Sequence, residues 1–360
     1  MKNYLTTVLC TIVMVLGSAI VAEESVTVVS FGGSYAKACV EGYHKAFEAE
    51  TGIKVNLEDY NGELSQLRAQ VEAGSVTWDV IDAEGPQVAI ACDEGLIETI
   101  DALNLPPSPD GVPAEEDFAP GTLTECGVGK VYYATMVAYH PDAFPDNEPT
   151  KVEDFFDLEN FPGRRGVHRS PQAVLEISLM ASGVAPEDVY DTLETEEGIE
   201  RAFGMLDSIK DDIVWWEAGA QPPQMLADRE VSMTIAWNGR IFNAQMLENQ
   251  PFKILWDGRT IDSGGMVIAA DAPNLENARK FVEFSARAES EAGVASYIAY
   301  SPVRKSGYDL VGNHAITGKP MKPHLPTNPE HGGRQLTLST DFWIDRRDEL
   351  VERFAAWLNR

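Results

Sequence analysis

Short apolar runs alternate with amphipathic segments along most of the chain. Residues 25–31 are rich in β-branched side chains, which predicts a strand, and a glycine turn leads from them into helical spacing over residues 36–50. A second strand is predicted over residues 53–60, which gives this segment the strand–helix–strand order of an α/β fold. The same patterns predict later strands at residues 78–82, 165–169, 213–217, 231–237 and 254–256, and helices at residues 64–73, 88–94, 197–209, 277–290, 292–300 and 342–359.

Two longer extended segments, residues 131–139 and 261–270, are predicted to cross between two lobes. A chain that crosses more than once forms a hinged molecule with a cleft, and clefts between domains are common places for small ligands. We therefore predict an α/β protein of two lobes, each with a central sheet flanked by helices and hinged by the crossing strands. The predicted limits are residues 23–133 plus 263–300 for lobe 1 and residues 134–262 plus 301–360 for lobe 2.

The N-terminal segment has the pattern of a secretory signal peptide. Lys2 supplies a positive start, Leu5 to Leu16 is mostly apolar, and Ala22 is a suitable last residue before cleavage. The apolar run is shorter than a bilayer-spanning helix requires. We expect residues 1–22 to be removed and the mature chain to be exported and soluble.

Three cysteines remain after this segment. An oxidising compartment permits one disulfide, and Cys92 and Cys126 flank a proline-rich stretch that a crosslink would restrain. We predict this pair, with Cys39 packed as a small apolar residue on a helix. Three cysteines without paired histidines do not make a zinc site.

The 360-residue chain carries a formal net charge of -29, and 44% of its residues are hydrophobic. The apolar content supports folded cores, while the negative charge argues against nucleic acid as a partner. The sequence contains no dinucleotide fingerprint and no phosphate-loop lysine. No cofactor is therefore expected.

The strongest candidate for a binding site lies at the junction of a predicted strand and helix. Trp237 ends the strand, Asn238-Gly239 breaks it, and Arg240 lies where the helix begins. The carboxyl ends of strands border ligand crevices in α/β sheets, and helix N-termini favour negative groups. The sequence favours a small ligand with an acidic group, although a core tryptophan beside a surface arginine would give the same pattern.

Other polar and aromatic side chains are expected at the same rim because they follow or end predicted strands. Arg169 and Ser170 precede a further helix, where ordinary helix capping explains the pattern as well as anion binding does. Only one of Trp215 and Trp216 can face the cleft; the spacing does not decide which, and Trp216 is taken as the candidate. The predicted ligand-binding residues are Ser34, Tyr35, Gln87, Thr135, Trp216, Gln221, Trp237, Arg240 and Asp262.

A series of short motifs runs through the chain. The motifs are Phe31–Tyr35, Phe47–Val55, Trp78-Asp-Val80, Asp154–Asp157, Phe161-Pro-Gly163, Leu175-Glu-Ile177, Gly219-Ala-Gln221, Trp237–Arg240 and Ala272-Pro-Asn274. In this order they resemble the solute-binding proteins of ABC importers, in the spermidine/putrescine-binding group. The resemblance implies the two-lobed periplasmic-binding-protein fold (type II-like), a periplasmic location, no catalysis and delivery of a solute to an inner-membrane permease. A monomer is expected.

The departures from the polyamine-binding pattern bear on the ligand. Polyamine binders of this family place acidic residues after the first strand and near Ser170, where this chain has Tyr35-Ala-Lys37 and Arg169–Gln172. Each buried amine requires a carboxylate, and Asp262 is the clearest one near the cleft, with Arg240 of opposite sign. We therefore favour an ω-amino acid such as 4-aminobutyrate, or a betaine-like compound, and keep a polyamine as the alternative.

Two other functions are expected less. A secreted hydrolase would require a nucleophile and a base, but there is no Gly-x-Ser-x-Gly motif and no histidine is expected in the cleft loops. A ferric-ion binder would require clustered tyrosines, and Tyr132 and Tyr133 face opposite sides of a strand.

Overall fold

The computed structural model describes residues 24–360, so the predicted signal peptide lies outside the described residues. The strands are β1 (Ser25–Ser30), β2 (Lys54–Asp59), β3 (Val80–Glu84), β4 (Val128–Tyr139), β5 (Arg165–His168), β6 (Ile213–Trp216), β7 (Met233–Trp237), β8 (Lys253–Ile268), β9 (Ser301–Pro302) and β10 (Gln335–Thr337). The helices are α1 (Gly33–Cys39), α2 (Lys45–Thr51), α3 (Ser65–Glu72), α4 (Gly85–Asp93), α5 (Ala114–Asp117), α6 (Val174–Ala181), α7 (Val189–Leu193), α8 (Glu196–Asp207), α9 (Gln221–Ala227), α10 (Asn238–Leu247), α11 (Leu275–Ser285), α12 (Ala288–Ala295), α13 (Lys305–Leu310) and α14 (Thr340–Leu358).

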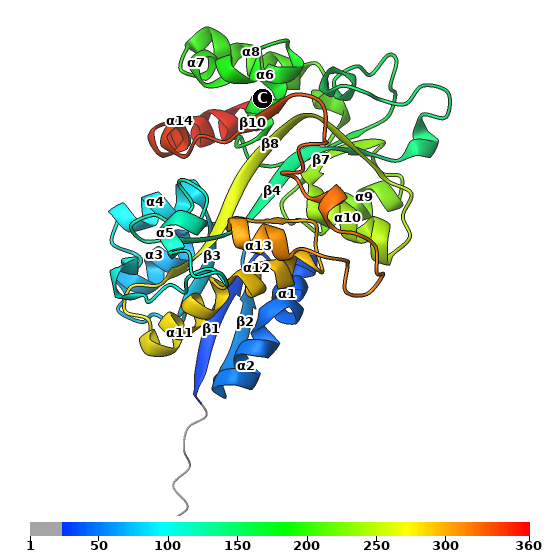
Figure 1. The fold of residues 1–360 in the computed structure, drawn as a ribbon. Helices are drawn as coiled ribbons and strands as arrows, with labels where there is room; N and C mark the ends of the chain where they lie inside the picture. The colour runs from blue at the N-terminus through cyan, green and yellow to red at the C-terminus, as the bar shows by residue number, and fades with distance from the viewer. Residues whose placement is uncertain (1–23) are drawn as a thin grey trace, which may run out of the picture.

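The strands form one hydrogen-bonded path in the order β2-β1-β3-β8-β4-β7-β5-β6, with β10 paired to β8 and β9 paired to β4. At one end β1, β2 and β3 are parallel, and at the other end β5 is parallel to both β6 and β7. The antiparallel pair β4 and β8 joins these groups and runs along the length of the molecule (Figure 1). The predicted crossing segments are therefore the strands that connect the two ends.

The structure confirms the mixed α/β fold with flanking helices, but the two predicted sheets are one continuous path. The sequence predicted separate strands at residues 254–256 and 261–270, whereas β8 spans both. The register of β8 against β4 shifts between Thr135 and Val137, and Gly258 adopts a φ of 74° beside this shift. A bulge with a glycine lets the strand continue through the polar residues that suggested a loop.

Each end of the sheet has its own hydrophobic core. Val28, Val80 and Phe281 belong to the core around β1 and β3, and Ile177 and Met233 belong to the core around β5 and β7. The apolar face of α14 packs into the second core. The residue limits given above for the two lobes stay a prediction.

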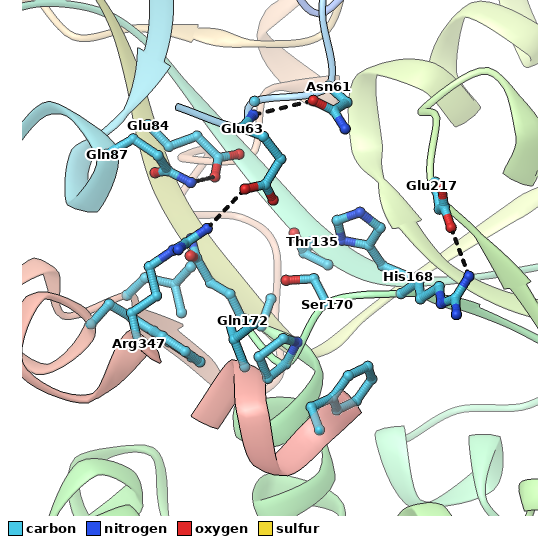
Figure 2. Close-up of a pocket in the computed structure, with 18 of the residues that line it drawn as sticks. Asn61, Glu63, Glu84, Gln87, Thr135, His168, Ser170, Gln172, Glu217 and Arg347 are labelled. Atoms are coloured by element: carbon cyan, nitrogen blue, oxygen red, sulfur yellow. Dashed lines mark hydrogen bonds and ion pairs between the residues drawn. The ribbon is translucent and has the colours of Figure 1, made fainter. Parts of the chain in front are cut away.

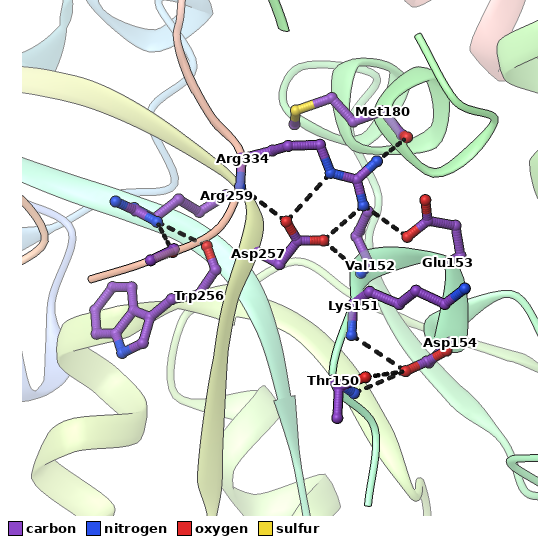
Figure 3. A network of polar contacts seen from close by, with 11 residues as sticks. Thr150, Lys151, Val152, Glu153, Asp154, Met180, Trp256, Asp257, Arg259 and Arg334 are labelled. Atoms are coloured by element: carbon purple, nitrogen blue, oxygen red, sulfur yellow. Dashed lines mark hydrogen bonds and ion pairs between the residues drawn. The ribbon is translucent and has the colours of Figure 1, made fainter. Parts of the chain in front are cut away.

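Arg334 fixes the segment that leads into α14 (Figure 3). One guanidinium nitrogen lies 2.6 Å from both Glu153 and Asp257, and another donates to the Met180 carbonyl oxygen at 2.9 Å. Since Asp257 belongs to β8, this network ties the C-terminal segment to the longest strand. Within residues 24–360, no helix combines the length and apolar character needed to cross a bilayer.

The predicted disulfide is confirmed, because Cys92 and Cys126 are bonded across a separation of 34 residues. Cys39 is a free, buried thiol on α1, as expected. The crosslink connects α4 to the loop before β4, and both segments pack on the first core.

Replacing both Cys92 and Cys126 by serine is expected to lower the free energy of unfolding by about 4 kcal/mol, because the crosslink restricts the unfolded chain. Urea denaturation of the variant and the parent would measure this difference. Cys39→Ala is the matched control, since it removes a buried thiol and keeps the disulfide. An equal effect of both changes would contradict the crosslink as the source.

Candidate functional site

The register of β4, β7 and β8 brings the site residues to one level of the sheet. Tyr133 of β4 is paired with Asp262 of β8, and Thr135 is paired with both Thr260 of β8 and Trp237 of β7. Side chains at paired positions of neighbouring strands lie on the same face. The sheet therefore places aromatic, hydroxyl and carboxylate groups side by side.

A cavity of about 380 Å³ lies over this part of the sheet (Figure 2). Figure 2 shows polar side chains from several elements pointing toward its centre. The rim carries charged side chains that are already paired, Arg347 with Glu63 at 3.4 Å and Arg169 with Glu217 at 3.0 Å. The inner lining includes Phe31, Glu84, Gln87, Tyr133, Thr135, His168, Ser170, Gln172, Trp237 and Trp343.

A smaller cavity of about 40 Å³ adjoins the larger one. Both are lined by Phe31, Glu84, Tyr133 and Trp237. These four side chains form a wall shared by the two cavities, so a solute in the larger cavity lies close to the groups that line the smaller one. The smaller cavity adds Tyr35, Asp82, Arg240 and Tyr300.

Asp262 is buried and hydrogen-bonded beside the larger cavity. Its carboxylate accepts from the Ser263 backbone N–H at 2.7 Å, from Tyr133 Oη at 3.2 Å and from Gln172 Nε2 at 3.3 Å. Burial, and then the charge of Glu84, raises the pKa of Asp262 to about 8. Among residues 24–360, no lysine, arginine or histidine forms an ion pair with this carboxylate. It is therefore suited to pair with the cationic group of a solute.

Arg240 lies in the smaller cavity and reaches the loop between β1 and α1. Its Nη1 donates to the Gly32 carbonyl oxygen at 2.9 Å and to Ser34 Oγ at 3.2 Å, and its Nη2 donates to the Phe31 carbonyl oxygen at 3.3 Å. A Cβ on Gly33 would stand 3.1 Å from Nη1, so the glycine permits this close approach. Nε has no hydrogen-bond partner within the described residues.

The structure brings most of the predicted binding residues together. Gln87, Thr135 and Trp237 line the larger cavity, and Tyr35 and Arg240 line the smaller one with Trp237. Asp262 bonds two side chains of the larger cavity, Tyr133 and Gln172. Ser34 lines neither cavity, and its hydroxyl oxygen accepts a hydrogen bond from Arg240 Nη1.

Two predicted residues lie behind the site or beside it. Trp216 is 1% exposed and lines neither cavity; its ring stacks on His168 at 4.3 Å and meets the edge of Trp237 at 5.4 Å. It supports the cavity wall from behind. The side-chain oxygen of Gln221 accepts from the backbone N–H groups of Glu217 and Ala218, which fixes the turn before α9.

Neither Ser170 nor Ser34 caps the helix that follows it. Helix α6 begins at Val174, four residues after Ser170, because Ala173 has a φ of 65° and interrupts helical geometry. Helix α1 begins at Gly33, so Ser34 lies inside its first turn and does not cap it. Both hydroxyls are therefore available for other contacts.

No histidine was expected in the cleft loops, but a histidine at the end of a strand borders the larger cavity. His168 ends β5 and lines the larger cavity, stacked on Trp216. Burial lowers the pKa of His168 to about 4, so the imidazole is neutral at ordinary pH. Among residues 24–360, no group of three histidine, cysteine, aspartate or glutamate side chains could hold a metal ion.

Sequence reasoning missed three contributions to the site. Glu84 ends β3 on the same face as Asp82, a period-two signal that alternation could have revealed. Tyr133 was considered only as an iron ligand. Trp343 and Arg347, one helical turn apart on α14, line the larger cavity, and that face was expected to be core packing.

Residues 42–327 match a family described as bacterial extracellular solute-binding protein. The chain belongs to this family. This solute-binding protein is 38% identical over 338 residues to the gamma-aminobutyric acid-binding protein of Pseudomonas aeruginosa, a match that covers 94% of this chain and 92% of the relative. Such homologues bind solutes and are not enzymes.

Two solved structures resemble this solute-binding protein over nearly their whole length. The PBP MotA from A. tumefaciens B6 in complex with glucopine matches with a TM-score of 0.82 and 27% identity, covering 93% of this chain and 99% of that one. The Atu4243-GABA receptor matches with a TM-score of 0.76 and 28% identity, covering 93% and 98%.

Proposed function

We propose that this protein captures an ω-amino acid such as 4-aminobutyrate in the joined cavities. The observation that carries the proposal is that an acid and a base contact the aromatic wall shared by the two cavities: Asp262 bonds Tyr133, and the Arg240 guanidinium lies over Trp237. A relative that is 38% identical over most of the chain is named for gamma-aminobutyric acid, which agrees with this arrangement.

In the proposed complex the ammonium group of the solute pairs with Asp262. The carboxylate of the solute pairs with Arg240 through the unpartnered Nε and the free N–H positions of the guanidinium, whose planar fork matches a carboxylate. The aliphatic body packs against Phe31 and Trp237. A betaine-like solute would use the same aromatic side chains for its cation.

A polyamine is the second candidate, and Glu84 is the observation that favours it. Glu84 lies beside Asp262 because both contact Tyr133 Oη, so two carboxylates, one half-buried and one buried, are found where the sequence indicated one. Two ammonium groups could each find an acid there. Arg240 opposes this assignment, because its charge would repel the second ammonium group.

The remaining parts of the proposal follow the family. The protein is proposed to work in the periplasm, to bind its solute as a monomer without turning it over, and to pass it to an ABC permease of the inner membrane. Closure of the two lobes over the solute would exclude water and strengthen the charged pairs.

A thermal-shift panel tests the choice of solute. A ligand at about one hundred times its Kd adds about 2.7 kcal/mol of stability, so binding solutes raise the melting temperature. We expect 4-aminobutyrate to raise it, with smaller effects from glycine betaine, putrescine and spermidine. A shift with the polyamines alone would replace the first candidate by the second, and no shift with any amine would refute both.

A further inference from the structure

Two carboxylates, buried Asp262 and half-buried Glu84, share one hydroxyl group at the wall between the cavities. Tyr133 Oη lies 2.6 Å from Glu84 Oε1 and 3.2 Å from Asp262 Oδ2. The two acids come from different strands, β3 and β8, which are direct neighbours in the sheet. A single hydroxyl has one proton to donate, so it cannot satisfy both carboxylates at the same time.

The groups around this pair do not neutralise it. Within residues 24–360, neither Glu84 nor Asp262 forms an ion pair with a lysine, arginine or histidine. Gln87 and Gln172 donate to them but carry no charge. The charged groups that face the pair from the surrounding elements are Glu63 before α3, Asp82 on β3, Glu176 on α6, Arg240 on α10 and Arg347 on α14.

These neighbours are engaged elsewhere or add further negative charge. Arg347 pairs with Glu63, and Arg240 donates to the β1–α1 loop. Glu176 is buried beneath Trp343, and its carboxylate accepts a hydrogen bond from the Trp343 indole N–H at 2.7 Å. The nearby tyrosines stay neutral because burial raises the pKa of each: Tyr60, Tyr133, Tyr190 and Tyr300.

Two adjacent carboxylates that share one hydroxyl group cannot both ionise without an electrostatic cost. Burial raises the pKa of both Glu84 and Asp262, and the negative charge of Glu84 raises the pKa of Asp262 further, to about 8. Near neutral pH the empty pair therefore holds a proton, which the Tyr133 hydroxyl helps to place between the two acids.

We propose that Glu84, Asp262 and Tyr133 form one ammonium seat, which holds a proton while empty and releases it when the ammonium group of the solute enters. The proposal rests on the proposed function for the ammonium end of the solute and adds Glu84 as a second solute-binding carboxylate. The incoming cation takes the place of the proton, so the net charge in the seat is unchanged. A solute without a cationic group cannot make this exchange.

The exchange fixes the sign of the pH dependence. The empty seat binds more protons than the occupied seat below about pH 8, so lowering the pH favours the empty protein. For exchange of one proton, the affinity falls about tenfold for each pH unit below that value. Above it, the affinity becomes nearly constant until the amine itself loses its proton near the pKa of a lysine side chain, about 10.4.

Calorimetric titration with 4-aminobutyrate near pH 7, in buffers of different ionisation enthalpy, counts the released protons. We expect the parent protein to release about one proton per solute bound, and Glu84→Gln, which keeps the shape and an acceptor for Tyr133, to release fewer, because the charge of Glu84 adds to burial in raising the pKa of Asp262. Glu94→Gln is the matched control: it removes an exposed carboxylate that pairs with Arg68, outside both cavities, and should release as many protons as the parent.

A parent protein that binds the solute and releases no proton would overturn the proposal, whatever the variants show. An unchanged proton count in Glu84→Gln would also overturn it. If 4-aminobutyrate does not bind, the proposed solute is wrong, and putrescine then serves as the titrant for the same count. The failure of the solute assignment and the failure of the proton exchange are therefore separate outcomes.

Discussion

Asp262→Asn is expected to weaken binding of 4-aminobutyrate about a hundredfold and to leave the protein folded. The change removes the charge that pairs with the ammonium group and keeps the shape of the side chain, with one acceptor oxygen in place of the two that accept from Ser263 and from Tyr133 and Gln172. Breaking one partner of a buried charged pair costs about 2–5 kcal/mol, and about 1.4 kcal/mol corresponds to a tenfold change in affinity. Calorimetry on the parent and the variant would measure the loss.

The stability of the empty variant separates lost binding from lost folding. The pKa of Asp262 is raised on folding, so between about pH 4 and pH 8 the native state binds more protons than the unfolded state, and the free energy of unfolding falls as pH rises. The neutral amide removes this dependence, so the variant should match or exceed the parent's melting temperature at neutral pH. A folded variant with unchanged affinity would remove Asp262 from the site.

Arg240→Gln is expected to weaken 4-aminobutyrate binding about a hundredfold and to change butylamine binding less than about threefold. Butylamine has the ammonium group and the chain of the solute but no carboxylate, so it makes no use of the guanidinium. Arg240→Lys should lie between the parent and the glutamine variant, because an ammonium group keeps the charge and loses the planar fork. The ratio of the two affinities in each variant is the measurement.

The two ligands also test a purely structural role of Arg240. The guanidinium donates to the carbonyl groups of Phe31 and Gly32, so its loss could loosen the β1–α1 loop. A loosened loop would weaken both ligands equally, which would contradict direct recognition of the carboxylate. Arg164→Gln is the control, because Arg164 lies outside both cavities in an exposed pair with Glu230 and exposed pairs contribute about 0–1 kcal/mol.

The sequence was sufficient for the parts of the fold set by local patterns. The alternating strands and helices, the disulfide and the position of Trp237 at a strand end all follow from residue spacing and type. The continuity of β8 was not predictable, because Gly258 and its polar neighbours resemble a loop until pairing with β4 shows a bulge. The single sheet path depends on that pairing.

Side-chain direction limited the prediction of the site. In β6 the neighbours Trp215 and Trp216 must face opposite sides, and no local signal shows that Trp216 packs behind His168 while Trp215 joins the core with Phe354. The face of α14 that covers the cavity is as apolar as one that covers a core. Alternation could have placed Glu84 at the site, but not next to Asp262, because the two are distant in sequence and become neighbours only through β3–β8 pairing.

The aromatic wall of the site has an optical consequence. Trp237 lines both cavities, contacts Trp216 edge-on and lies close to the Arg240 guanidinium. Indole emission responds to the charge and hydration around the ring, so a solute that displaces water from this wall changes the ultraviolet fluorescence of the unlabelled protein. The intrinsic tryptophan fluorescence therefore reports whether the site is occupied, and stopped-flow mixing can follow it without an attached probe.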